Sequence, residues 1–345
     1  MKFQLPAQLF PNRLCLLALV SATFCGGCGA PSFLITPVAN TSSLQELEVQ
    51  PGKGWWPPRV AIIEVEGMLM NARVGGFLQA SENPVSRFTQ QMEAAERDKS
   101  VKAVVLRVNC PGGTVTATDT MYQIVKRFKE KTHKPVVAST QEVAASGGYY
   151  VSLASDQIIV QPTSVVGSIG VVFETMQFKG AMDKLGITSE AIKSGSLKDM
   201  GSPFKLLRDD EKEVMQEMVD EYFARFVALV RQHRPQVKEE ALTDLNAYKK
   251  PGYAGVFSGR VYSGAKAVEL GLADRTGTLS DAIDAARKLA KVPNAGAILY
   301  KRPYGYGGSI YADTQTPTPK SNVLRLELPE PNAFLPDGFY YLWRP

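Results

Sequence analysis

Short apolar runs alternate with segments of helical periodicity along most of this chain. Residues 101–108 are nearly all apolar, which predicts a strand buried on both faces, and residues 60–65 and 157–160 predict two further strands. Between them, residues 84–97 and 116–131 carry apolar side chains at helical spacing. Strands that alternate with helices predict an α/β fold with right-handed crossovers, in which active groups gather on loops at the strand ends.

The second half of the chain predicts fewer strands and one long helix. We expect a strand over residues 188–192, a loop over 193–203, and a helix over 209–232 with an apolar stripe of Val214, Met218, Tyr222, Phe226 and Val230. Residues 302–345 lack periodicity and are expected to be irregular or extended. Their apolar end, residues 339–343, should dock on its own domain or on a neighbouring subunit.

The segment around Ser146 differs from the rest of the chain. An apolar strand at residues 135–139 leads to Ser146, and Gly147 and Gly148 follow it. A serine between a strand end and a helix start lies near free backbone N–H groups, which can hold an oxyanion. The alternative is a serine N-cap at a tight packing point, and the segment alone favours that alternative. A nucleophilic role requires a base from elsewhere in the chain.

The N-terminus carries a targeting signal over residues 1–28. Its apolar core, residues 14–24, is shorter than an ideal membrane span. Small residues before Cys28 resemble a bacterial lipoprotein cleavage box, although Cys25 stands where Leu or Val is usual. This pattern favours lipid attachment at Cys28 over secretory cleavage or an uncleaved anchor, and all three place the domain outside the cytoplasm. Residues 29–58, rich in Pro, Ser, Thr and Gln, are expected to form a linker.

Composition and charge exclude several classes of function. The 345 residues are 44% apolar and 21% charged, as in ordinary globular proteins, and a net charge of +5 without a basic cluster argues against nucleic-acid binding. Of the four cysteines, only Cys110 lies outside residues 1–28, and we expect it to be buried. No paired cysteine spacing suggests zinc, and no cofactor is expected.

The choice of base for Ser146 is limited by the histidine content. His133 and His233 are the only histidines, and both are expected in exposed turns, which argues against a Ser-His-Asp triad. A lysine whose pKa is lowered by desolvation can also activate a serine. Lys198 is the candidate, because it lies in a loop of small and apolar residues. The alternative is a surface lysine paired with Asp199, and the residues alone favour that alternative.

Several short motifs occur in a fixed order along the chain. They are residues 104–109 with Pro111-Gly112-Gly113, residues 144–150, residues 167–170, and residues 193–195 with Lys198-Asp199 and 201–203, followed by 259–264 and 269–272. In this order they resemble signal peptide peptidases of the SppA type, peptidase family S49. The resemblance covers roughly residues 59–292, which would be the peptidase domain, with residues 293–345 as a C-terminal tail.

The resemblance implies a ClpP/crotonase-like fold, a Ser-Lys dyad and a ring-like homo-oligomer. Carried over residue by residue, Ser146 is the nucleophile, Lys198 the general base, and Ser168 the serine that orients the lysine. The N–H groups of Gly113 and Gly147 form the oxyanion hole. One departure is the cysteine at position 110, where the family usually has serine; the change is isosteric, and little effect is expected.

The resemblance also implies apolar peptides as substrates, such as cleaved signal peptides. It implies a bacterial, membrane-anchored protein whose catalytic domain lies on the extracytoplasmic side. Two alternatives remain at this point: a crotonase-like enzyme that acts on acyl-CoA, and a catalytically silent assembly protein that kept the fold. The first needs neither a serine at position 146 nor a lysine at position 198, and this chain has both. The second predicts that a serine-reactive inhibitor does not label Ser146.

Overall fold

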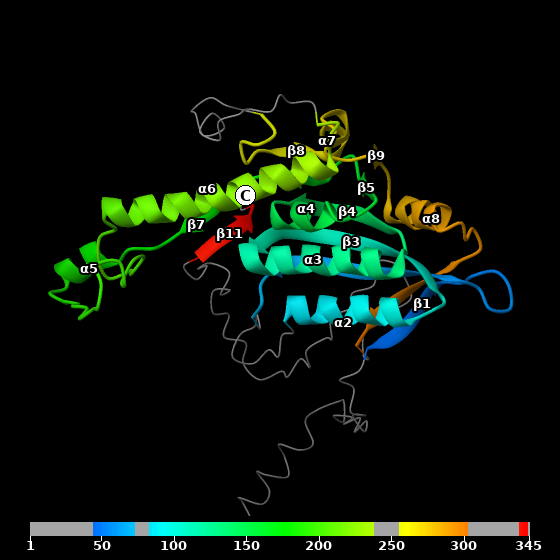
Figure 1. Cartoon of the computed structure of the whole chain (residues 1–345), viewed down its shortest axis with the longest axis horizontal. Coiled ribbons are helices and arrows are strands. Elements are labelled where there is room, and N and C mark those ends of the chain that lie inside the picture. The colour runs from blue at the N-terminus through cyan, green and yellow to red at the C-terminus, as the bar shows by residue number, and fades with distance from the viewer. Residues whose placement is uncertain (1–43, 73–82, 238–254, 303–337, 344–345) are drawn as a thin grey trace, which may run out of the picture. The chain divides into compact units, whose positions relative to one another are not determined.

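Parallel strands buried on both faces form the centre of the fold (Figure 1). The computed structural model describes residues 44–72, 83–237, 255–302 and 338–343, all of which belong to one unit, residues 42–345. The strands are β1 Gln45–Gln50, β2 Arg59–Leu69, β3 Val101–Thr114, β4 Val136–Ala145, β5 Gln157–Val160, β6 Val165–Gly167, β7 Val172–Glu174, β8 Val261–Ser263, β9 Arg275–Thr276, β10 Gly296–Lys301 and β11 Gly338–Leu342.

These strands join one sheet in the order β1-β10-β2-β3-β4-β5-β9. Strands β10, β2, β3, β4, β5 and β9 run parallel, and β1 is antiparallel to β10. The C-terminal part of β4 pairs in parallel with β6, and β6 pairs in turn with β8, which is antiparallel to it. This arrangement confirms the predicted α/β class, and it is a ClpP/crotonase-like fold.

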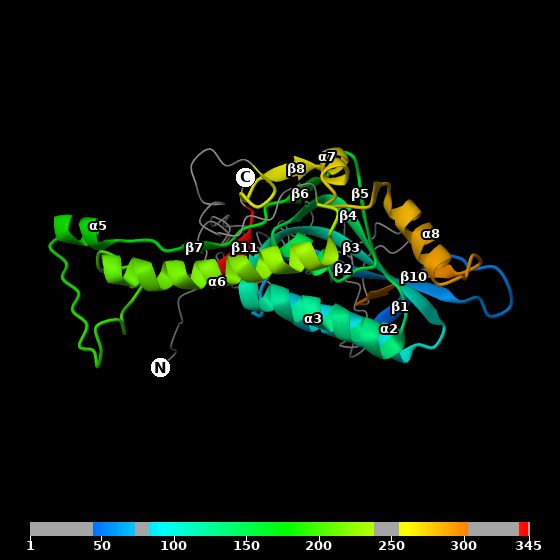
Figure 2. The same cartoon turned by 45° about the horizontal axis from the view of Figure 1, so that its top comes forward.

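Helices cover both faces of the sheet, which explains the continuous apolar runs. The helices are α2 Pro84–Arg97, α3 Val115–Thr132, α4 Gly147–Ser152, α5 Lys179–Lys184, α6 Asp209–His233, α7 Gly264–Glu269 and α8 Leu279–Leu289. Ile63 and Leu106 lie in the core that includes residues of α2, α3, α4 and α6, whereas Ile62 and Val105 pack with residues of α8 on the opposite face. Figure 2 shows α8 apart from the other long helices. Within the described residues, no helix is both long and apolar enough to cross a membrane.

The sheet extends beyond the expected domain boundaries at residues 59 and 292. Residues 45–50 were expected in the linker, yet they form β1 and pair with β10. Strand β10 itself, expected in the tail, is fully buried between β1 and β2. The predicted linker was therefore too long, and the tail contributes two strands. The targeting segment with Cys28 lies outside the described residues.

Two local predictions were also wrong. Residues 188–192 do not form a strand; the apolar side chain of Ile192 is fully exposed, so nothing packs on this segment to fix a pleat. The helix predicted to begin at residue 116 begins at Val115, and its N-cap is Thr114, whose Oγ1 accepts a hydrogen bond from the Ala117 N–H. The helix therefore begins directly at the end of β3, close to Gly113.

After β7 the chain leaves the sheet, and it returns to the core along α6. We call residues 175–208 the arm; it contains α5, which has no buried residue. In both views α5 lies beyond the first turns of α6, on the side away from α8 (Figures 1 and 2). Of the apolar stripe predicted for α6, Phe226 and Val230 are buried, whereas Val214 and Met218 are only partly covered. The C-terminal half of α6 thus packs on the core, and its first half supports the arm.

Candidate active site

Ser146 lies at a sharp turn between β4 and α4. Its backbone has φ 48° and ψ −112°, a conformation that costs a residue with a side chain on the order of 1–3 kcal/mol. Two bonds hold it there: the Ser146 N–H donates to the Gly167 carbonyl at 2.7 Å, and the Ser146 carbonyl accepts from the Tyr150 N–H at 2.9 Å. The Oγ atom is buried and has no hydrogen-bond partner among the described residues. The fold therefore maintains a strained serine with an uncommitted hydroxyl.

The two glycines predicted to supply oxyanion donors pack against each other. A Cβ atom placed on Gly147 would lie 3.1 Å from the Gly113 nitrogen and 3.0 Å from the Gly112 Cα. Gly112 has φ 122°, which only glycine adopts readily, and this turn presents the end of β3 to Gly147. The structure thus brings together Ser146, Gly147 and Gly113.

Ser168 also lies near this turn. The residue before it, Gly167, pairs with Ala145 in the sheet and accepts the Ser146 N–H. Ser168 is buried, has φ 51°, and donates its own N–H to the Arg260 carbonyl at 2.8 Å. The backbone of Ser168 thus follows directly on the carbonyl that binds the Ser146 N–H.

Lys198 is in a different environment. It lies in a turn of the arm, its side chain is exposed, and its N–H donates to the Gly195 carbonyl at 3.2 Å. Within the described part of the chain its ammonium group forms no ion pair. In the single chain, Lys198 forms no hydrogen bond with the Ser146 Oγ, which has no partner among the described residues.

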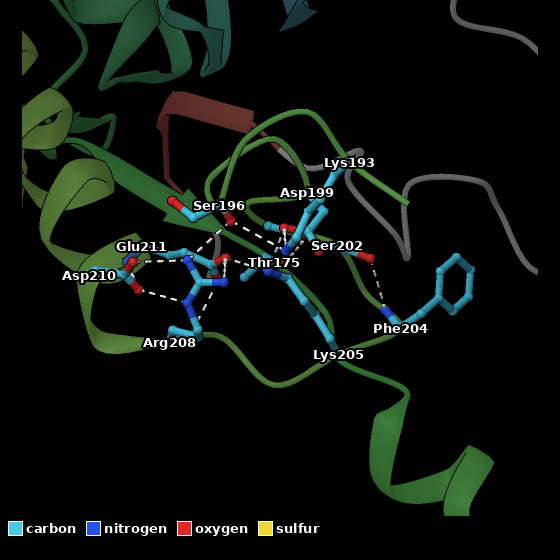
Figure 3. Close-up of polar contacts among 11 residues, drawn as sticks. Thr175, Lys193, Ser196, Asp199, Ser202, Phe204, Lys205, Arg208, Asp210 and Glu211 are labelled. Atoms are coloured by element: carbon cyan, nitrogen blue, oxygen red, sulfur yellow. Dashed lines mark hydrogen bonds and ion pairs between the residues drawn. The ribbon is translucent and has the colours of Figure 1, made fainter. Parts of the chain in front are cut away.

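An ion-pair network holds the loop around Lys198 (Figure 3). Lys193 and Lys205 both donate to the Asp199 carboxylate, at 2.7 Å and 2.9 Å, and Lys205 also pairs with the buried Glu211 at the start of α6. Lys193 and Lys205 lower the pKa of Asp199 to about 2. Asp199 is therefore committed to other cations, and the expected alternative, a pair between Lys198 and Asp199, is not formed.

The other titratable candidates do not reach Ser146. Cys110 is buried as predicted; its Sγ accepts from the Gly112 N–H at 3.3 Å, and burial raises the thiol pKa to about 12. His133 is exposed as predicted. His233, also expected to be exposed, is half-buried instead, because its Nε2 contacts the Tyr122 hydroxyl at 2.7 Å. None of these side chains forms a hydrogen bond with the Ser146 Oγ.

Sequence reasoning missed two features of the site. Thr118 of α3 is buried, its Oγ1 has no partner among the described residues, and this atom would lie 2.7 Å from a Cβ on Gly147. In addition, β11 pairs with residues 112–114 of β3. Nothing in the sequence marked Thr118, which is one of several threonines in α3. The apolar end of the tail signalled docking, but not its position.

Comparisons with known proteins identify the family of this chain. The model of Peptidase family S49 matches residues 128–293, and that of Clp protease matches residues 62–169. A Methanocaldococcus jannaschii protein named as a protease is 36% identical over 225 residues, which cover 65% of this chain and 68% of that protein. An Enterococcus faecium protein named as a signal peptide peptidase SppA is 34% identical over 243 residues, covering 70% and 67%.

Two further likenesses are lower in coverage or in identity. The chloroplastic serine protease SPPA of Arabidopsis thaliana is 30% identical over 241 residues, which cover 68% of this chain and 33% of that protein. Among solved structures, a mutant of the 1510-N membrane-bound stomatin-specific protease is similar at 14% identity with a TM-score of 0.40, covering 65% of this chain and 83% of that one.

Proposed function

Because the chain belongs to peptidase family S49 and is a serine peptidase, we propose that Ser146 is its nucleophile and Lys198 its general base. The observation that carries the proposal is the buried, strained Ser146, whose free Oγ lies in the turn next to two adjacent glycine amides. An uncommitted hydroxyl next to paired N–H donors suits acyl transfer, since the donors can hold the oxyanion that forms on attack.

The proposed reaction has two halves. The Ser146 Oγ attacks a peptide carbonyl carbon, its proton passes to the neutral Lys198 amine, and the oxyanion accepts hydrogen bonds from the N–H groups of Gly113 and Gly147. The C–N bond then breaks, and the lysine returns the proton to the leaving amine. Water attacks the acyl-serine by the reverse sequence, which releases the acid and frees Ser146.

We further propose that Lys198 reaches Ser146 from a neighbouring copy of the chain. Three observations support this: the exposure of Lys198, the commitment of Asp199 to other lysines, and large exposed apolar side chains on the arm, namely Phe178, Leu185, Ile187, Ile192 and Leu206. Apolar side chains in such number mark a surface that becomes covered by protein. Covering the arm would also exclude water from the Lys198 amine, an environment that suits a lysine base.

The substrate and location remain part of the proposal. We propose apolar peptides such as cleaved signal peptides as substrates, a homo-oligomeric ring as the working form, and attachment to a bacterial membrane through Cys28. The catalytic domain then lies on the extracytoplasmic side.

Inhibitor labelling tests the nucleophile. A fluorophosphonate probe added to membranes that contain the full chain should label the peptide with Ser146, and Ser146→Ala should lose the label. Absence of label on folded protein supports the silent assembly protein instead. Lys198→Ala should lower kcat/KM by ~10³-fold or more, because the serine loses its base. Near wild-type turnover by Lys198→Ala contradicts the dyad.

Mixed oligomers test the origin of the lysine. Ser146→Ala and Lys198→Ala chains, each inactive alone, should regain activity when they are co-expressed. Random assembly places an intact serine beside a neighbour's intact lysine in roughly a quarter of the interfaces. A mixture that assembles but remains inactive would place the lysine on the same chain as its serine.

A further inference from the structure

Two adjacent tryptophans lie in the middle of the loop that joins β1 to β2. Trp55 is 90% exposed and Trp56 is 88% exposed, whereas tryptophan side chains in folded proteins are highly buried on average. Two large rings that follow each other in the chain add a sizeable apolar area to one place on the surface. An exposed apolar area of this kind marks a site that binds a partner.

The base of this loop is fixed to the domain. The Lys53 N–H donates to the Asn294 carbonyl at 3.0 Å, and the Asn294 side-chain amide donates to the Lys53 carbonyl at 3.0 Å. After the tryptophans, the Pro58 carbonyl accepts from the Gly296 N–H at 2.8 Å. The loop is thus bonded on both sides of the tryptophans to the chain around the start of β10. The exposure of the two rings is therefore a property of the folded loop.

Three exposed lysines lie in the same region. Lys53 precedes the tryptophans, Lys288 lies in the last turn of α8, and Lys291 follows that helix. In both views the loop after β1 and the end of α8 lie together, on the side away from α5 (Figures 1 and 2). Within the described part of the chain no ion pair engages these lysines, and the carboxylate of Asp284 is paired with Arg287 at 2.8 Å. The aromatic rings therefore lie near positive charge that no carboxylate of the described residues neutralises.

We call Lys53, Trp55, Trp56, Lys288 and Lys291 the docking patch. We propose that the docking patch binds the surface of a bilayer that contains anionic phospholipids: its rings insert at the headgroup level and its lysines bind headgroup phosphates. Tryptophan is enriched at membrane–water interfaces, because its ring is apolar while its N–H donates to polar groups. Lysines near an anionic leaflet add an attraction that salt screens. Protein–protein interfaces also enrich tryptophan but deplete lysine, so the three lysines favour a lipid surface.

The length of the chain before the patch agrees with a membrane as its partner. Residues 29–44 join Cys28, the proposed attachment point, to β1, and a chain of this length spans at most about 60 Å. The 6 residues of β1 cover roughly 20 Å between the start of the strand and the loop. The tether is therefore long enough for Cys28 and the docking patch to meet the same bilayer.

Docking through this patch determines the side from which Ser146 is reached. Strand β2 begins directly after the loop, and β2, β3 and β4 run parallel, whereas Ser146 follows the end of β4. The 10 residues of β4 span roughly 33 Å. The loop and Ser146 thus lie at opposite ends of the sheet, and a bilayer under the loop leaves Ser146 on the aqueous side. Only the bearing of this orientation on substrate access rests on the proposed function.

Quenching of tryptophan fluorescence by lipid tests the insertion. The full chain is reconstituted into vesicles of phosphatidylglycerol and phosphatidylcholine, with or without bromine on the acyl chains. The chain has three tryptophans, so Trp343→Phe leaves Trp55 and Trp56 as the only emitters. Brominated lipid should lower their emission at least about twofold, because rings at the headgroup level lie close to the bromine atoms. The Trp55→Phe/Trp56→Phe chain, in which only Trp343 emits, is the control and should not be quenched.

Charge reversal tests the lysines. In the Trp343→Phe chain, Lys291→Glu should lower the ratio of docked to undocked molecules about tenfold, since a cation near the anionic headgroups becomes an anion. Vesicles of phosphatidylcholine alone should weaken docking of the parent chain in the same way. Lys184→Glu is the matched control, because Lys184 is an exposed lysine of α5 at the other end of the molecule. This variant should be quenched like the parent chain.

Each remaining outcome overturns the inference. Unquenched Trp55 and Trp56 in a chain whose circular dichroism shows a folded domain would exclude insertion. A blue-shifted emission that brominated lipid does not quench would show that a protein surface covers the loop instead of lipid. Equal quenching in neutral and anionic vesicles, or in Lys291→Glu and its parent, would exclude headgroup binding by the lysines. None of these measurements uses peptide hydrolysis, so a failure of the peptidase proposal is recognised separately.

Discussion

The Gly147 residue packs against the Gly113 amide so closely that a Cβ on Gly147 would lie 3.1 Å from the Gly113 nitrogen. The same Cβ would also lie 2.7 Å from the buried Thr118 Oγ1. Two amides from separate motifs thus share one small volume next to Ser146. Any side chain at position 147 must displace β3 or α3. This displacement changes the spacing between the N–H groups of Gly147 and Gly113.

Gly147→Ala should therefore lower kcat by ~10²–10³-fold, about the loss of one oxyanion donor, while the protein stays folded. Steady-state kinetics and a thermal melt measure the two quantities. Gly170→Ala is the control, because its nearest neighbour would lie at an ordinary 3.5 Å. Full activity in Gly147→Ala would exclude this turn as the oxyanion site.

Cys110 is predicted to be chemically inert in the folded protein. Burial raises its pKa to about 12, so the thiolate fraction stays negligible through pH 9, and the side chain is inaccessible. Iodoacetamide should modify the Cys110 peptide only after denaturation, as mass spectrometry of digests would show. Cys110→Ser should keep activity within about twofold, since the Gly112 N–H can donate to either atom. Rapid modification in the native state would contradict the burial.

The central sheet was predictable because local patterns suffice for buried parallel strands. Residues 60–65 and 101–108 are apolar throughout most of their length, and both lie inside strands with helices on each face. Strand β1 was not predictable as such, since Gln45–Gln50 becomes a strand only through its pairing with β10, which is remote in the chain. Residues 188–192 have strand-like composition, but nothing packs on them.

The site was predictable to a similar extent. The order of motifs predicted roles for Ser146, Gly147, Gly113 and Ser168, and these residues lie at neighbouring strand ends because β3, β4 and β6 are neighbours in the sheet. No motif could show that Lys198 is exposed, since exposure depends on how the arm folds. The position of β11 depends on a long-range pairing with β3 and β7, which composition does not encode.

Asp199→Asn should loosen the loop that carries Lys198. The variant loses the carboxylate shared by Lys193 and Lys205, so amide hydrogen exchange over residues 193–205 should rise. If Lys198 is the base, kcat should fall several-fold with little change in KM, because the loop positions the base rather than the substrate. Asp209→Asn is the control, since Asp209 is an exposed carboxylate whose salt bridge is to Lys212. Unchanged exchange in Asp199→Asn would show that the network does not order the loop.

His233 should make the fold less stable in mild acid. Burial next to Tyr122, together with nearby cations, lowers its pKa below the usual 6.5, so the unfolded chain binds the proton more readily than the folded one. Stability from this residue is therefore present above about pH 6.5 and declines as the pH falls below it. His233→Gln should reduce the decrease in Tm between pH 7 and pH 5.5, and the exposed His133→Gln should not. Equal pH slopes in all three proteins would contradict this assignment.

The arm should be required both for assembly and for activity. Ile192 and Leu206 are exposed on it, and an aspartate at either position would put a charge into any interface that covers the arm. Ile192→Asp should shift the protein to smaller species in sedimentation velocity and abolish turnover, while Ser146 keeps its turn. Leu289→Asp is the matched control, since Leu289 is an exposed leucine at the end of α8, away from the arm. If Ile192→Asp sediments and cleaves like the parent protein, the arm is not the contact between copies, and the lysine must reach Ser146 within one chain.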